Sequence, residues 1–74
     1  MKYCVVIIQD ESTTASYMFD KKSDAIARFH HEMEYANNAN ITTVCTVVNT
    51  DAVVIASEKH TAEPPAAAEG GEGE

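Results

Sequence analysis

Two apolar runs of this chain lack the alternation of apolar and polar residues that marks a strand with one exposed face. One reads Tyr-Cys-Val-Val-Ile-Ile from Tyr3 to Ile8, and the other reads Thr-Thr-Val-Cys-Thr-Val-Val from Thr42 to Val48. Strands of this composition are typically buried on both faces. The pattern therefore predicts two central strands, over residues 2–9 and 41–48.

Between these runs the apolar residues recur at helical spacing. They form one stripe on a helix: Ala25, Ile26, Phe29, Met33 and Ala36. Either Asp20 or Ser23 is expected to cap the start of this helix. Residues 37–40 are rich in asparagine, which tolerates the left-handed conformation, so the helix is predicted to end near residue 36. Arg28 can pair with Asp24 or with Glu32, each four residues away.

Two further strands complete the pattern. Residues 10–16 are polar and predict a loop, residues 17–19 a short edge strand, and residues 52–59 a fourth strand after a tight turn. The order β-β-α-β-β predicts an α+β fold, with one antiparallel four-stranded sheet and a single helix packed on one face. With the most apolar strands at the centre, the strand order is 2-1-3-4; the alternative places the first strand parallel to the fourth.

The end of the chain differs in composition from the rest. A domain is predicted over residues 1–60 and a disordered acidic tail over residues 61–74, because Pro, Ala, Gly and Glu dominate the tail and bury little surface. Four tail glutamates contribute −4 to a net charge of −7: Glu63, Glu69, Glu72 and Glu74. The chain has five Lys and Arg residues and no basic cluster, so we expect no nucleic-acid partner.

The location of the protein is predicted from its apolar segments and its cysteines. No segment approaches the ~20 apolar residues of a membrane span, and the first run does not have the pattern of a signal peptide. We therefore expect no membrane association and a cytoplasmic location. Cys4 and Cys45 are expected to be reduced residues of the core.

Few residue patterns in this chain indicate chemistry. The glycines all lie in the tail, so a glycine-rich phosphate loop is missing. His30 and Glu34 lie four residues apart and could bind a metal ion if His60 or a cysteine supplied a further ligand, but such residues more often coat the edge of a helix. Whether they bind a metal is left open. We expect a protein that is not an enzyme, with no catalytic residue and no cofactor.

One group of helix residues is typical of a protein contact. By helical phase Tyr35 points away from the apolar stripe, beside His31 and Arg28. Exposed aromatic residues next to arginine are enriched at binding hot spots. The alternative is that Tyr35 packs on its own helical turn.

Three segments resemble other sequences. Residues 2–10, 29–35 and 41–45 make the chain similar to small proteins of gut Firmicutes and their prophages. The resemblance covers residues 2 to about 60 and excludes the tail. It implies no activity.

These observations lead to two functional hypotheses. The first is a small non-catalytic interaction protein, a homodimer that buries the sheet face its single helix leaves uncovered. The alternative is an acidic prophage-type inhibitor that occupies a basic site on a host nucleic-acid-handling protein. In either case a further, unidentified protein partner is possible.

Overall fold

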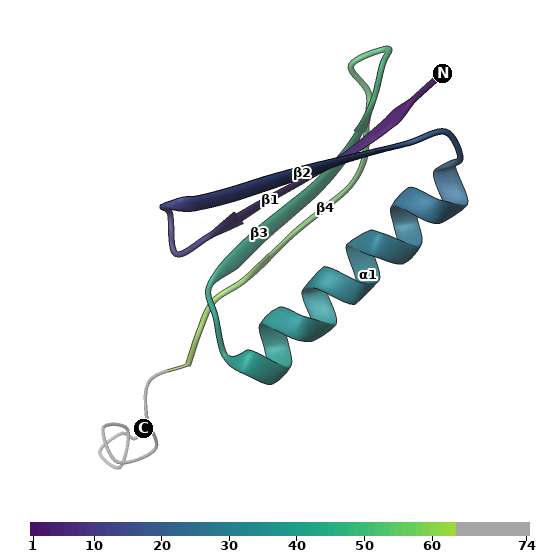
Figure 1. Ribbon diagram of the computed structural model, residues 1–74. Helices are drawn as coiled ribbons and strands as arrows, with labels where there is room; N and C mark the ends of the chain where they lie inside the picture. Colours follow the sequence, from purple (N-terminus) through teal and green to yellow (C-terminus); the bar gives the residue numbers. More distant parts are fainter. Residues whose placement is uncertain (64–74) are drawn as a thin grey trace.

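Residues 1–63, the part of the chain that the computed structural model describes, form four strands and one helix (Figure 1). The elements are β1 (Tyr3–Gln9), β2 (Thr13–Phe19), α1 (Lys22–Ala39), β3 (Thr43–Asn49) and β4 (Val54–His60). Every strand pairing is antiparallel, and the order across the sheet is β2-β1-β3-β4. The predicted fold class and strand order are therefore confirmed, and the alternative with the first strand parallel to the fourth is wrong.

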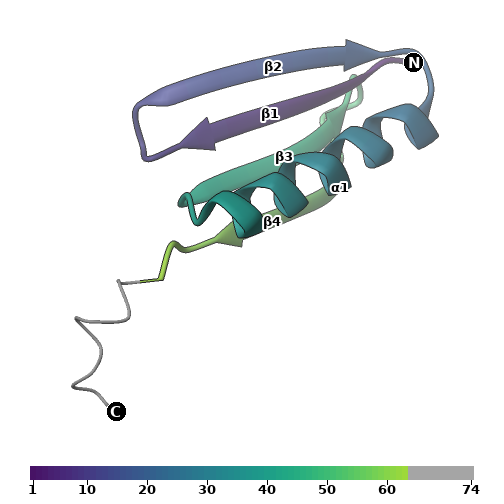
Figure 2. The same cartoon turned by 60° about the horizontal axis from the view of Figure 1, so that its bottom comes forward.

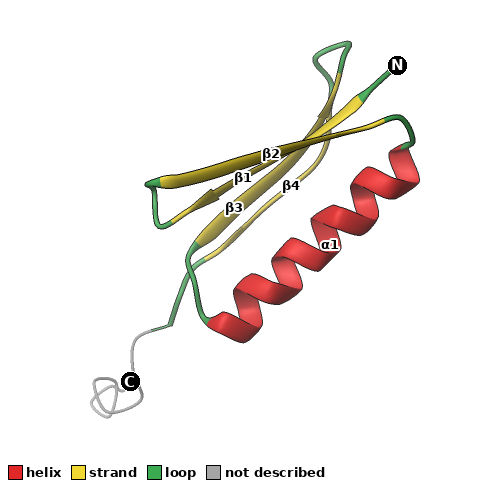
Figure 3. Cartoon of the chain, in the orientation of Figure 1, coloured by secondary structure: helices red, strands yellow, loops and turns green. Residues whose placement is uncertain are grey.

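The molecule has two layers, a sheet and a helix. Figure 1 shows the sheet nearly edge-on with α1 along one side of it, and Figure 3 shows the same view coloured by secondary structure. The core lies between the layers, where Val5, Cys45 and Val47 are fully buried. Phe29 of α1 packs against them from the helix. The central strands are the apolar ones because they provide most of this buried contact.

The second strand is longer than its sequence pattern predicts. Residues 13–16, expected in a loop, pair with β1 up to Thr13 opposite Gln9. The prediction was wrong because β2 is an edge strand with six of its seven residues exposed, so no apolar alternation marks it. Between the strands Asp10 and Glu11 have φ of 53° and 63°, and the Ser12 amide donates to the Gln9 carbonyl over 3.1 Å. Positive φ at consecutive turn residues suits the twist of a tight hairpin.

Both ends of α1 differ from the prediction. Neither Asp20 nor Ser23 caps the start: Lys21 does, with extended backbone and no side-chain hydrogen bond. The helix continues to Ala39 and ends at Asn40, which has φ 57° and ψ 51°. An asparagine in the left-handed conformation thus terminates the helix, as expected. It is Asn40 rather than Asn37, because Asn37 is still part of the helix.

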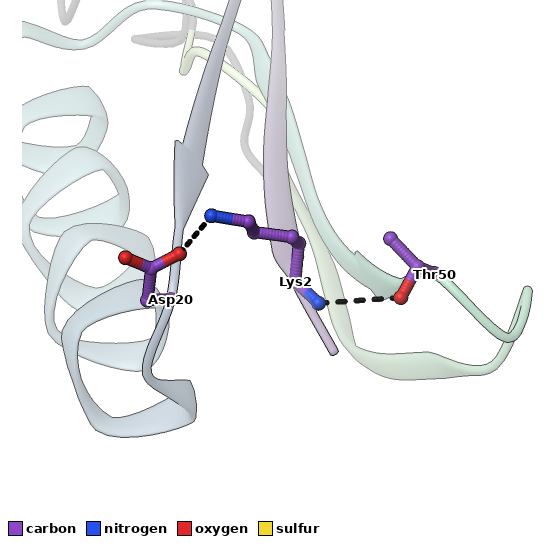
Figure 4. Close-up of polar contacts among 3 residues, drawn as sticks. All are labelled: Lys2, Asp20 and Thr50. Atoms are coloured by element: carbon purple, nitrogen blue, oxygen red, sulfur yellow. Dashed lines mark hydrogen bonds and ion pairs between the residues drawn. The ribbon is translucent and has the colours of Figure 1, made fainter.

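Asp20 forms a contact between the layers instead of a helix cap. Its carboxylate pairs with the ammonium group of Lys2, and the Lys2 amide donates to Thr50 Oγ1 over 3.2 Å (Figure 4). The Lys2 ammonium lowers the pKa of the Asp20 carboxyl. These contacts connect the start of β1, the start of α1 and the turn before β4.

The last described residues are held by side chains of the loop that follows α1. Asn40 makes two hydrogen bonds to the backbone of Glu63, accepting from its amide at 2.8 Å and donating to its carbonyl at 3.0 Å. The Ala62 amide donates to Thr42 Oγ1 over 2.9 Å. Ala62 and Glu63 of the predicted tail are therefore bound to the domain, and residues 64–74 lie outside the described residues. No helix within residues 1–63 is both long and apolar enough to cross a membrane.

Candidate interaction face

The two faces of the sheet differ in what covers them. Successive strand residues point to opposite faces. The residues that face α1, which define the inner face, include Val5 and Ile7 on β1 and Cys45 and Val47 on β3, and none is more than 4% exposed. In Figure 1, where the sheet is nearly edge-on, the helix lies along one side of the sheet and no other element of residues 1–63 lies along the opposite side.

The residues between them form the outer face. The pairing across all four strands places these apolar side chains there: Cys4, Val6, Ile8, Met18, Val44, Val48 and Val54. Ile8 is 36% exposed, Met18 61% and Val54 58%. They share the face with Thr14, Ser16, Thr46, Ser57 and Lys59, and exposed apolar side chains gathered on one face commonly mark an interaction site. The prediction that the central strands are apolar on both faces is thus correct, and only one face is covered within the described residues.

The polar residues of the outer face carry little charge. Thr46 Oγ1 and Ser57 Oγ lie 2.9 Å apart and share a hydrogen bond across β3 and β4. Among the described strand residues on this face, Lys59 alone is charged. Because these two hydroxyls already have a partner, covering them with an apolar surface costs less than covering unpaired groups.

The three helix residues expected at a protein contact do not all point to solvent. His31 is exposed and Tyr35 is 50% exposed, as their helical phase predicts. Arg28 is different: its guanidinium carbon lies 4.0 Å from the centre of the Tyr17 ring on β2. The expectation that Arg28 lies on the side opposite the apolar stripe was wrong, because it stacks on an aromatic residue of the edge strand.

Arg28 also forms an ion pair within the helix. Its Nη2 lies 2.7 Å from Glu32 Oε2, so Glu32 is the partner that it takes of the two available at four-residue spacing. Glu32 is only 9% exposed, whereas Met33, which helical periodicity placed in the apolar stripe, is partly buried and packs against the core as predicted. The buried stripe runs through Ala25, Phe29, Glu32 and Ala36. Only the spacing from Arg28 indicated that Glu32 has a partner, and no sequence pattern indicated that it is buried.

The candidate metal ligands of the sequence are not brought together. His30 and Glu34 are exposed on α1, and the His30 ring packs edge-to-face against Phe29 with centroids 5.4 Å apart. His60 lies at the end of β4, opposite Thr43. Within residues 1–63 no three His, Cys, Asp or Glu side chains lie close enough together to hold a metal ion.

The two cysteines lie on opposite faces of the sheet, and both are free thiols. Cys45 is a core residue as predicted, and its burial, with a contribution from the nearby Glu32 carboxylate, raises its pKa to about 11. Cys4 is half-buried on the outer face, so the expectation of a core position was wrong for this residue. The apolar surroundings of Cys4 belong to a surface that α1 does not cover.

The chain was also compared with known proteins. Comparison of the chain with protein-family models, with curated proteins and with solved structures found no match in any of the three. The functional argument therefore rests on the geometry of the domain.

Proposed function

We propose that this protein is a small non-catalytic interaction protein that forms a homodimer by packing the outer faces of two sheets against each other. The observation that carries the proposal is the set of apolar side chains on the outer face, which no described residue covers. Burial of apolar surface is the main favourable contribution to association. In a sheet-on-sheet dimer, side chains from two such faces interdigitate across a layer about 10 Å thick.

The size of the face supports a dimer of moderate affinity. Four strands of seven residues, at ~4.8 Å between strands and ~3.3 Å per residue, cover about 440 Å² in projection. Two copies would bury on the order of 1,000 Å² in total, near the lower limit of ~1,200 Å² for specific complexes. We therefore expect a dissociation constant in the micromolar range.

The distribution of charge supports a second copy as the partner. A chain of net charge −7 repels its own copy, but Lys59 is the charged strand residue of the outer face. Glu58 on β4 lies opposite Cys45 on the inner face, and the other described acidic residues lie on α1 or outside the helix and strands, so none is a strand residue of the outer face. An apolar face with few charges can approach an identical face without burying an unpaired charge.

The acidic inhibitor remains a prediction from composition. Its basic target would need a concentrated acidic surface. The described acids are spread over several elements, so the dimer is the function that the geometry supports better.

Sedimentation equilibrium of the full chain tests the dimer. The wild-type protein should change from monomer to dimer over the micromolar range, and Val6→Lys, which places a charge at the middle of the outer face, should self-associate much more weakly. Ala27→Lys makes the same charge change on an exposed helix position and should dimerise like the wild type. Urea unfolding of each variant checks that the fold is retained.

Two results would contradict the proposal. One is a wild-type protein that is still monomeric at high micromolar concentration. The other is a folded Val6→Lys variant that dimerises as strongly as Ala27→Lys.

A further inference from the structure

The outermost strand β2 has an open edge. It pairs with β1 on one side, and the strand order places no described strand on its other side. Figure 2 shows β2 along the margin of the sheet. In an antiparallel pair about half of the backbone N–H and C=O groups of an edge strand point outward, without a partner from the sheet.

The two edges of the sheet are not protected alike. Soluble proteins protect an edge strand with charged residues, proline or a bulge, because an unprotected edge pairs with other chains. β4 carries Glu58 and Lys59, and its pairing with β3 is irregular between Val47 and Val48. β2 has the sequence Thr-Thr-Ala-Ser-Tyr-Met-Phe, with neither a charge nor a proline. An unprotected edge on only one side indicates that this edge is used.

We propose that β2 pairs in antiparallel orientation with β2 of a second copy, with Ser16 of the two copies opposite each other on a twofold axis. This contact would join two sheets into one continuous sheet of eight strands, since each copy contributes four. It goes beyond the proposed function, because it uses the edge of the sheet and leaves the outer face free.

Charge complementarity favours a second copy as the occupant. With Ser16 at the centre, Thr13 lies opposite Phe19 of the second copy, so the turn that carries Asp10 and Glu11 approaches the segment of the second copy that carries Lys21 and Lys22. The antiparallel arrangement repeats this approach at the other end of the strand, so each acidic turn meets a basic loop.

The distribution of cations makes this match specific to β2. Lys2 pairs with Asp20 and Arg28 pairs with Glu32, so Lys21 and Lys22, which follow β2, supply the positive charge at this end of the strand. The acidic pair Asp10 and Glu11 lies at the other end of the same strand. An edge that is acidic at one end and basic at the other is complementary to itself only in antiparallel orientation.

A charge-swap experiment tests the contact. Glu11→Lys and Lys21→Glu should each weaken self-association about tenfold, because like charges then face each other twice in the complex. A mixture of the two variants should regain it, since both ends of a mixed pair again carry opposite charges. Sedimentation equilibrium of each variant alone and of the mixture measures the difference.

The same charge changes on the other edge serve as the control. Glu58→Lys and Lys59→Glu lie on β4, and mixing them should give no gain over the separate proteins. A mixture of the β2 variants that associates no better than each variant alone would overturn the proposal, and so would a gain confined to the β4 variants. Val6→Lys should leave the gain in the β2 mixture intact, which separates this contact from the outer-face dimer.

A disulfide trap tests the register without a change of charge. In a Cys4→Ala background, Ser16→Cys should form an intermolecular disulfide under mild oxidation, because opposed residues of an antiparallel pair lie ~4.5–5.5 Å apart at Cα. Thr14→Cys, on the same side of β2, would lie about 13 Å from its counterpart and should stay reduced. Equal crosslinking of the two variants, or none in Ser16→Cys, would rule out this register.

Discussion

The two faces of one sheet are built from the same residue types but are in different environments. On β1, Val5 and Ile7 are buried under α1, whereas Val6 and Ile8 alternate with them and remain partly or largely exposed. The composition of a strand therefore does not say which of its faces the chain itself will cover. A small domain with one helix can cover only one face, so the other is available for a partner.

Replacement of a core residue on the inner face should have the largest effect on stability. Phe29→Ala should lower the free energy of unfolding by about 3–5 kcal/mol, because it removes the largest side chain that α1 places against the sheet. Tyr35→Ala, on the same helix but 50% exposed, should cost less than about 1 kcal/mol. Urea unfolding measures both, and similar losses would mean that the inner face is not the main core.

The buried carboxylate of α1 should have the next largest effect. Glu32→Ala leaves the partly buried Arg28 guanidinium without its carboxylate, and should cost about 1–3 kcal/mol. Glu34→Ala, exposed on the same helix, should change stability by less than about 0.5 kcal/mol. If Glu32→Ala were as stable as Glu34→Ala, the ion pair would contribute nothing measurable to the contact between α1 and β2.

The cysteines compare the two faces directly. At pH 8, and at a concentration low enough to keep the protein monomeric, a thiol reagent should modify Cys4 in the folded protein, while Cys45 should react only on unfolding because it is fully buried with a pKa raised to about 11. Since the folded pKa of Cys45 lies above its unfolded value of 9.0, its contribution to stability is complete below pH 9 and is lost as the pH rises to about 11.

The pH dependence of unfolding isolates this contribution. The urea midpoint of the wild type should fall more steeply between pH 9 and about 11 than that of Cys45→Ala, in which the thiol is absent. Cys4→Ala should follow the wild type. Parallel curves for the wild type and Cys45→Ala would show that the inner face admits water at this position.

The exposed contact between the layers should have the smallest effect. Lys2→Met removes the ammonium group beside Asp20, so the pKa of that carboxyl should return toward its ordinary value of 3.8. The folded pKa of Asp20 is depressed, so its small contribution is present above the unfolded pKa and is lost as the pH falls through the folded one. Carbon-detected NMR titration measures the change, and Lys22→Met should leave Asp20 unaltered.

Local sequence pattern was sufficient for the order of elements and the centre of the sheet. The apolar runs on β1 and β3 predict central strands because only central strands bury that much surface, and the spacing of Ala25, Phe29 and Ala36 predicts the helix because all three are buried on one side of it. The second apolar face was also visible in the sequence, since the same runs show no polar alternation.

Tertiary structure decided the features that depend on neighbours. The length of β2 follows from pairing with β1, because an exposed edge strand needs no apolar pattern of its own. Arg28 of α1 stacks on the Tyr17 ring of β2 and pairs with the buried Glu32, and helical periodicity alone does not predict a contact with another element. Sequence spacing determines which side of a helix or strand a residue occupies, but the physical environment of that side is set only when another element packs against it or leaves it open.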